Sequence, residues 1–269
     1  MEKLITVLIP TYNNHELFSR LIKTYIKDSR VLILVSDDSD DHIEKISIKK
    51  FCINNNISYF EGTKKSPPEN WNYLLSMVST PFFVINHHDE YPDNLNYLDI
   101  LDSNNHGLIV LPCSSKVGNV PMHKLFSWQQ KYFSRVCMLW PNASFNMILA
   151  PTASLIVNSR YKNVLFDPNL KWFVDAEWYL KLFSFSSREK KKILFYFQSR
   201  IFSFQAQNSI TRSLRDTLKK QIKKEKNYLR DKGLIPKRIF RIFQLLSLLL
   251  ISLRSKFYIM FDKFYLKRI

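Results

Sequence analysis

The sequence LITVLIPTYNN at residues 4–14 decides the fold, because a short buried strand ends here in a cluster of polar side chains. Its apolar part, residues 4–9, is continuous and rich in β-branched residues, which is typical of a strand covered on both faces. The same arrangement recurs twice. VLILV at residues 31–35 leads into SDDSDD, and FFVI at residues 82–85 leads into NHHDE. These runs predict parallel strands.

Amphipathic stretches lie between the strand-like runs. We expect helices at 15–27, 43–55, 69–78 (directly after the breaker pair Pro67-Pro68) and 175–185. Further strands are expected at 57–60, 108–111 and 153–157, with 193–197 and 201–204 as a late hairpin or sheet edge. This alternation predicts an α/β, Rossmann-like fold with a mostly parallel sheet and flanking helices.

Composition narrows the class of protein. A chain of 269 residues with 46% hydrophobic content suits one substantial domain plus an appendage, and it excludes wholesale disorder. Only 4 glycines occur, and neither G-x-G-x-x-G nor G-x-x-x-x-G-K-[ST] is present. This argues against a dinucleotide-binding protein and against a P-loop NTPase. Three scattered cysteines (Cys52, Cys113, Cys137) fit a reducing compartment, and we expect no signal peptide because the N-terminal apolar run is short and is interrupted by Pro10. We therefore expect a cytoplasmic protein.

The net charge of +17 is unevenly distributed. Residues 1–187 hold 18 basic and 18 acidic side chains, whereas residues 188–269 hold 22 basic and 5 acidic ones. We therefore expect one domain over 1–208, whose charge is balanced as far as residue 187, and a basic helical extension over 209–269. The extension has one helical pattern at 211–232, opened by the capping-box pair Ser213 and Asp216, and a second at 237–266.

The second pattern contains an uncharged stretch at 242–253. As a helix it would span about 18 Å, less than the roughly 30 Å of a bilayer core. We therefore expect residues 236–269 to lie as an amphipathic helix on an anionic membrane surface, at the inner face of the cell membrane. Packing on its own domain, or on a second copy in a homodimer, is the alternative.

Three polar clusters follow successive strands, so they should converge on the edge of the sheet where ligands bind in α/β folds. Ordinary solvated loops are the alternative for each. An Asp38 carboxylate suits the ring N–H of uracil or thymine, and Tyr12 can pack on a base. Asp37 and Asp38 can instead cap the next helix, a role that Asp40 or Asp41 fills equally well.

The cluster NHHDE at 86–90 combines imidazole and carboxylate groups, which suit Mn²⁺ or Mg²⁺ held together with phosphate oxygens. A zinc site is a weaker alternative. The other alternative is that no metal binds: one histidine is buried in the core, and Asp89 caps the next helix. Asp175 and Glu177 lie among aromatic residues, where burial can raise a carboxyl pKa toward that of a general base. Capping of their own helix is the alternative for these two acids.

Taken together, these segments resemble the family 2 glycosyltransferases with the GT-A fold. Pro10-Thr11-Tyr12-Asn13 is similar to the family's P-x-[YF]-N, and residues 35–41 to its V-V-D-D-G-S-T-D. Only Asn72 matches the R-N-x-G helix. Residues 86–92 take the place of the metal-binding D-x-D-D-x-x-P, and residues 174–182 that of the E-D-x-x-x-x-L-[RK]-L helix.

The resemblance implies an inverting transfer from a nucleotide-sugar, with a UDP-sugar favoured, that moves a hexosyl or N-acetylhexosaminyl group. The acceptor would be a glycan or lipid-linked glycan in surface polysaccharide synthesis, such as lipopolysaccharide O-antigen or capsule. The resemblance assigns the following roles: catalysis to Asp175 and Glu177, nucleotide-sugar binding to Pro10, Thr11, Tyr12, Asn13, Asp38, Asn72 and His87, and Mn²⁺ or Mg²⁺ binding to His88 and Asp89. We expect Thr152 and Ser154 on the acceptor side. Asn86 and His88 stand where the family has acids, which implies an altered metal site.

Two other functions remain open from the sequence. A nucleic-acid-binding protein would explain the +17 and the aromatic residues, but the charge lies in the extension and the aromatics lie in core-like runs, so we expect no nucleic-acid partner. A GT-A sugar-binding or scaffold subunit would keep the fold without the activity, with Asn86 marking a weakened metal site.

Overall fold

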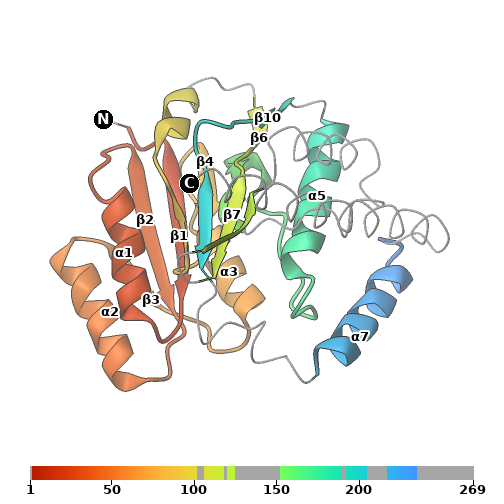
Figure 1. Cartoon of the computed structure of the whole chain (residues 1–269), viewed down its shortest axis with the longest axis horizontal. Coiled ribbons are helices and arrows are strands. Elements are labelled where there is room, and N and C mark those ends of the chain that lie inside the picture. Colours follow the sequence, from red (N-terminus) through yellow and green to blue (C-terminus); the bar gives the residue numbers. More distant parts are fainter. Residues whose placement is uncertain are drawn as a thin grey trace, which may run out of the picture.

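The structure is a computed structural model that describes residues 2–101, 106–117, 120–124, 152–189, 192–204 and 217–234. Within these residues the main sheet has the strand order β10-β6-β9-β4-β1-β2-β3 (Figure 1). Its strands are β1 (Ile5–Thr11), β2 (Val31–Asp37), β3 (Ser58–Glu61), β4 (Phe82–Ile85), β6 (His106–Val110), β9 (Leu155–Asn158) and β10 (Lys192–Phe195). β9 runs antiparallel to both of its neighbours, and the other described pairs are parallel. The predicted mostly parallel α/β sheet is confirmed.

Helices cover both faces of this sheet. The helices are α1 (His15–Tyr25), α2 (His42–Asn54), α3 (Pro67–Ser76), α5 (Val174–Arg188) and α7 (Leu218–Asp231), with short 3₁₀ turns η1 (Asn96–Ile100), η3 (Thr152–Ser154) and η4 (Ser159–Tyr161). A second, smaller sheet has the order β5-β11-β7-β8. Its strands are β5 (Glu90–Pro92), β11 (Ile201–Phe204), β7 (Cys113–Val117) and β8 (Val120–Lys124).

The core has two layers because successive side chains of a strand point to opposite faces. On β1, Ile5, Val7 and Ile9 pack with α1, α2 and η1, where Phe18 is fully buried. Leu8 faces the other way and packs with α3, α5 and α7. The sheet is thus covered on both faces, as its continuous apolar runs predict.

Two helix starts show how the local sequence directs the fold. α3 begins at Pro67 and not at residue 69, so the proline pair does not precede the helix but opens it. The first turn of a helix needs no backbone N–H partner, which is why proline is favoured there, and the Ser66 side chain caps it by accepting from the N–H of Glu69 at 3.4 Å. α2 is capped by Asp41, which leaves Asp37 and Asp38 for other contacts.

The late strands do not form a hairpin, so that alternative is wrong. β10 pairs in parallel with β6 at the edge of the main sheet, as the sheet-edge alternative predicts. β11 lies in the second sheet between β5 and β7. The chain between them crosses from one sheet to the other.

α7, drawn in blue in Figure 1, is the helix that the structure describes in the basic extension, and it packs on the domain. Leu229 is fully buried in the core layer that contains α5, and Ile222 and Tyr228 pack against that layer. Lys232 forms an ion pair with Asp167 at 2.5 Å, and the Tyr228 hydroxyl donates to the same carboxylate at 2.8 Å. Burial alone would raise the pKa of Asp167, but these donors, with the Asn169 backbone and side chain, lower it to about 2.

The rest of the extension lies outside the described residues. This holds for the predicted capping box at Ser213 and Asp216, for the apolar stretch 242–253 and for the whole segment 236–269. Among the helices that the structure does describe, none has the length and apolar character needed to span a bilayer.

Candidate functional site

The three polar clusters meet at one edge of the main sheet, as predicted. Thr11 is paired with Asp37 in the parallel register, and the Asp38 N–H donates to the Thr11 carbonyl at 3.1 Å. On the other side of β1, the Asn86 N–H donates to the Leu8 carbonyl at 2.9 Å. β1 lies between β2 and β4, so the chain order reverses here, which is the place where open α/β sheets bind ligands.

Asn13 joins the first two loops. Its backbone has φ 45°, its N–H donates to Ser39 Oγ at 2.8 Å, and its side-chain oxygen accepts from the N–H groups of Asp40 and Asp41 at 3.1 and 3.0 Å. These contacts give Asn13 a structural task at the loop junction. Tyr12 beside it donates its hydroxyl to Asp40 at 2.8 Å and remains 42% exposed, so its ring can pack on a nucleobase.

Asp38 and Asp37 have different surroundings. Asp37 is fully buried and accepts a hydrogen bond from the Tyr59 hydroxyl at 3.1 Å. Asp38 accepts from the Lys64 N–H at 2.8 Å, and burial raises the pKa of this carboxyl while that N–H opposes the rise. Gly62 lies directly against Asp38: a Cβ at residue 62 would be 2.1 Å from Asp38 Oδ1. The glycine therefore makes the space in which this carboxylate lies.

Asn86 holds the loop that follows β4. It is fully buried, and its side-chain NH₂ donates to the carbonyls of His87 and Glu90 at 3.0 and 2.5 Å. Its side-chain oxygen accepts from the Tyr25 hydroxyl at 2.6 Å. Asn86 therefore holds the turn through its side-chain amide. Because both ends of that amide bond to protein groups, the side chain is not oriented as a metal ligand. An aspartate would lack the two N–H donors that this turn uses.

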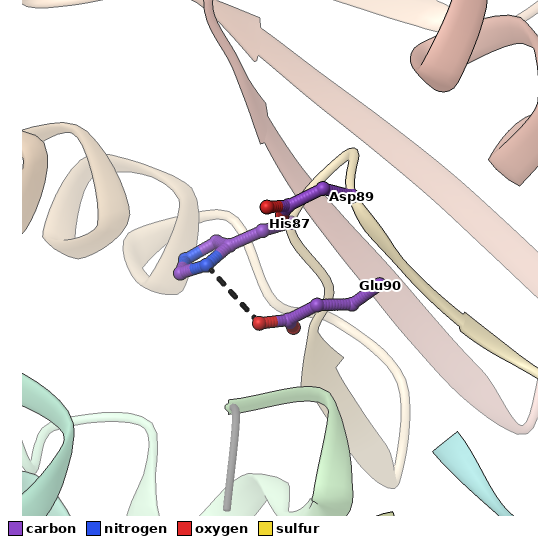
Figure 2. Close-up of side chains that lie close together, drawn as sticks. All are labelled: His87, Asp89 and Glu90. Carbon is purple, nitrogen blue, oxygen red and sulfur yellow. Dashed lines mark ion pairs between the residues drawn. The ribbon is translucent and has the colours of Figure 1, made fainter. Parts of the chain in front are cut away.

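His87, Asp89 and Glu90 bring their ligand atoms within 4.8 Å of one another. Figure 2 shows the imidazole and the two carboxyl groups on the same side of the loop, with His87 Nδ1 3.5 Å from Glu90 Oε1. Burial alone would lower the pKa of His87, but Glu90, and then Asp175 and Asp89, raise it to about 9. His87 Nε2 is buried and has no hydrogen-bond partner in the structure.

This donor set fits Mn²⁺ or Mg²⁺. One imidazole nitrogen with two carboxylates suits Mn²⁺ in particular, while zinc in structural sites prefers a closed tetrahedral set. A cation bound here would displace the proton of His87, so its affinity would rise with pH. The predicted ligand His88 is not a member of this group. Its pKa is lowered by burial, and its ring contacts the backbone of Pro10.

A chain of aromatic rings fixes His87 relative to α5. The His87 ring lies 4.7 Å from Trp71 of α3, and Trp71 meets Phe166 edge-on at 5.0 Å. Phe166 stacks on Trp178 of α5 at 4.4 Å. Because packed rings tolerate little displacement, these ring contacts couple the position of the loop after β4 to that of α5.

Asp175, in the first turn of α5, lies close enough to this cluster to interact electrostatically with His87 and Glu90. Burial raises its pKa to about 6, the His87 charge opposes the rise, and Glu90 adds to it. Its Oδ1 is buried without a hydrogen-bond partner in the structure. Glu177 does not join the cluster. It is 2% exposed and forms an ion pair with Lys181 at 2.8 Å on a different side of the helix.

The residues predicted on the acceptor side lie in η3, next to the loop. The Ala153 N–H donates to Glu90 Oε2 at 3.4 Å, which places Thr152 and Ser154 beside that acid. The hydroxyl of Thr152 is fully buried and has no partner in the structure, and the same is true of Thr11 Oγ1 at the end of β1.

Asn72 makes structural contacts within the protein, and its predicted contact with a nucleotide stays a prediction. Its side-chain NH₂ donates to the Phe166 carbonyl at 3.0 Å, and its oxygen accepts from the Phe166 N–H at 2.8 Å. Both ends of the amide are therefore used to attach α3 to the segment before α5.

Sequence reasoning assigned no role of their own to two residues at this edge. Glu90 follows Asp89 directly in NHHDE, so its acidity was the available signal. Gly62 was marked only by the scarcity of glycine and by its place after β3. Its contact with Asp38, which lies on another loop, is visible only in three dimensions.

The architecture and this sheet edge define an α/β fold of the GT-A type. Solved structures of S. aureus TarS share it. The TarS 1–349 structure in complex with UDP-GlcNAc has 17% identity and a TM-score of 0.55 over 78% of this chain and 61% of that chain. The complex with UDP has 16% identity and a TM-score of 0.53 over 76% and 61%.

A longer TarS structure has 17% identity and a TM-score of 0.52 over 75% of this chain and 36% of that chain. This chain thus spans between about a third and three fifths of the solved chains it resembles. No protein-family model and no curated protein matches it. At this identity the likeness establishes the fold.

Proposed function

We propose that this protein is a glycosyltransferase that uses a nucleotide-sugar, with a UDP-sugar as the favoured donor. The observation that carries the proposal is the setting of Asp175: its carboxyl oxygen is buried without a partner, within electrostatic reach of His87 and Glu90, which form a possible metal site with Asp89. The ordered motifs shared with family 2 glycosyltransferases support it. So does the fold shared with TarS, which has been solved with UDP-GlcNAc and with UDP.

The donor would lie across the edge from β2 to β4. Asp38 accepts the ring N–H of the base, Tyr12 packs on the base, and the backbone of Pro10 and Thr11 lines the site. The diphosphate lies beside His87, next to the possible metal site that His87 forms with Asp89 and Glu90. A divalent ion held by these three side chains would stabilise the negative charge of the departing diphosphate as a Lewis acid.

Asp175 acts as the general base. It accepts the proton of the acceptor hydroxyl while that oxygen forms a bond to the anomeric carbon. The acceptor oxygen attacks from the face opposite the diphosphate, which inverts the anomeric centre. The bond from this carbon to the diphosphate oxygen breaks, and the nucleoside diphosphate leaves with the electron pair. Burial favours this role, because a pKa near 6 makes the carboxylate a better proton acceptor than an exposed aspartate and still leaves it ionised at neutral pH.

The acceptor approaches past Thr152 and Ser154 and is a glycan or lipid-linked glycan in surface polysaccharide synthesis. The basic segment 236–269 holds the protein on the anionic inner face of the cell membrane. Deletion of 236–269 should therefore release the protein from anionic liposomes, and equal binding by the shortened chain would contradict this part of the proposal.

A second candidate is a GT-A subunit that binds nucleotide-sugars without transferring them. The observation that favours it is Asn86, which replaces a family acid and is used entirely to hold the loop. Such a subunit would bind donor and leave it intact, whereas the enzyme would release nucleoside diphosphate.

The test is a panel of UDP-, dTDP- and GDP-sugars, each offered with Mn²⁺ and with a chelator. We expect a thermal shift with uridine nucleotides and slow hydrolysis of at least one UDP-sugar that depends on the cation. Binding without hydrolysis or transfer would favour the second candidate. The absence of a thermal shift with every nucleotide would refute both.

A further inference from the structure

Glu225 of α7 is buried against the segment that leads into α5. Its side chain is 1% exposed although it belongs to the basic extension. The carboxylate accepts hydrogen bonds from three consecutive backbone N–H groups, those of Lys171 at 2.8 Å, Trp172 at 3.1 Å and Phe173 at 2.9 Å. Gln221, one turn earlier on α7, donates to the same carboxylate at 2.5 Å.

The position of Glu225 on α7 explains why an acid is buried here. Ile222, Glu225 and Leu229 are three and four residues apart and therefore lie on one face of the helix. Leu229 is fully buried, and Ile222 packs against the core. Glu225 thus occupies a core position in an otherwise apolar stripe, and a buried carboxylate is tolerated there because four donors satisfy it.

Residues 171–173, whose N–H groups bind Glu225, end directly before α5, the helix that carries Asp175. Phe173 accepts the Glu177 N–H at 2.9 Å, so it is the residue from which the first turn of α5 starts. Asp175 lies in that turn. The orientation of this turn relative to His87 and Glu90 therefore depends on where residues 171–173 are held.

We propose that Glu225 is a positioning residue of the active site: by binding the N–H groups of residues 171–173, it holds the first turn of α5, and with it Asp175, in place near His87 and Glu90. The catalytic consequence rests on the proposed glycosyltransferase function. A small displacement of a catalytic group lowers the rate of the chemical step more than the affinity for the donor. The basic extension thus contributes to the active site through α7.

The chain offers a matched control in Lys232. Its ion pair with Asp167 also attaches α7 to the region before α5, but it does not touch residues 171–173. Glu225→Gln keeps the shape of the side chain but loses its charge. It also replaces one accepting oxygen by an NH₂ group, which cannot accept a hydrogen bond from the backbone N–H groups. Lys232→Met removes an α7 contact of comparable length and leaves the bonds of Glu225 in place.

Hydrogen exchange of the full chain reads out the position of the segment without activity. In Glu225→Gln we expect the amides of residues 171–173 to exchange about tenfold faster or more, and in Lys232→Met we expect them to be unchanged. In steady-state UDP-sugar turnover, Glu225→Gln should lower kcat about tenfold with KM within about twofold, and Lys232→Met should leave both within about twofold. Glu225→Asp, one methylene shorter with the charge kept, should change exchange and kcat in the same direction and serves if Glu225→Gln does not fold.

The outcomes separate this proposal from the proposed function. Unchanged exchange at 171–173 in both Glu225 variants would overturn the anchoring, whatever the activity. Faster exchange with unchanged kcat, or equal loss of kcat in Lys232→Met, would overturn the positioning role. A wild-type protein that turns over no donor would refute the proposed function, and the exchange data would still decide whether Glu225 holds the segment.

Discussion

Replacing Gly62 by alanine should weaken nucleotide binding and leave the protein folded. A Cβ at this residue would lie 2.1 Å from Asp38 Oδ1 and 2.7 Å from Asp38 Cγ. Carbon and oxygen atoms in contact are normally more than 3 Å apart, so the carboxylate has to shift by roughly 1 Å. The shift also breaks its hydrogen bond with the Lys64 N–H.

The size of the effect follows from the role of Asp38. If this carboxylate accepts the ring N–H of the base, the shift removes a hydrogen bond to a charged group, which contributes about 1.5–3 kcal/mol. This corresponds to a Kd for UDP that is roughly 10- to 150-fold higher. The φ angle of Gly62 is not in the left-handed region, so alanine adds no backbone strain, and the melting temperature should change by only a few degrees.

Isothermal titration of UDP in the presence of Mn²⁺ measures this directly. Gly233→Ala is the control, because Gly233 has φ 71° and no neighbouring atom within 4 Å of an added Cβ. This control strains the end of α7 and should leave the UDP affinity unchanged. A Gly62→Ala protein that is folded and binds UDP within about twofold of wild type would refute the assignment of Asp38 to the base.

The remaining predictions concern the loop after β4 and the packing of α7. Asn86→Asp loses two buried N–H donors, so it should lower the free energy of unfolding by about 2–3 kcal/mol without raising Mn²⁺ affinity, and tighter Mn²⁺ binding would contradict the structural role of Asn86. His87→Ala should abolish Mn²⁺ binding in titration calorimetry, while His88→Ala should keep it. Loss of binding in His88→Ala and not in His87→Ala would instead identify His88 as the ligand, as the sequence predicts. Because the pKa of Asp167 is lowered from 3.8 to about 2 on folding, its stabilising contribution of roughly 2 kcal/mol is complete above about pH 4 and is lost as the pH falls toward 2. The difference in unfolding free energy between wild type and Asp167→Asn should therefore disappear over this range, and a constant difference would show that the ion pair has no such role.

The strands and the sheet edge could be predicted because their signals are local. Continuous β-branched runs at β1, β2 and β4 end in polar residues, and parallel strands necessarily bring their carboxyl ends together. The placement of the three polar clusters, and of Asp175 near the loop after β4, follows from this rule together with the order of the motifs.

What could not be predicted depends on contacts between distant segments. Asn72 matches a family motif, yet its amide is used by the backbone of Phe166, which lies 94 residues further along the chain. His87, and not His88, lies within reach of Asp89 and Glu90 because of the path of the loop after β4, which Asn86 holds through its bonds to the His87 and Glu90 carbonyls. Glu225 is separated from its backbone donors by more than 50 residues, and nothing in a basic helix marks one acid as buried.

The central claim is that Asp175, and not Glu177, accepts the acceptor proton at a nucleotide-sugar site. The most direct measurement is the rate of UDP release from a UDP-sugar by wild type, Asp175→Asn and Glu177→Gln under the same Mn²⁺ concentration. We predict that Asp175→Asn loses a factor of about 100 or more in kcat, while Glu177→Gln, whose partner is Lys181, stays within about tenfold of wild type. Full activity in folded Asp175→Asn, or the larger loss in folded Glu177→Gln, would contradict it.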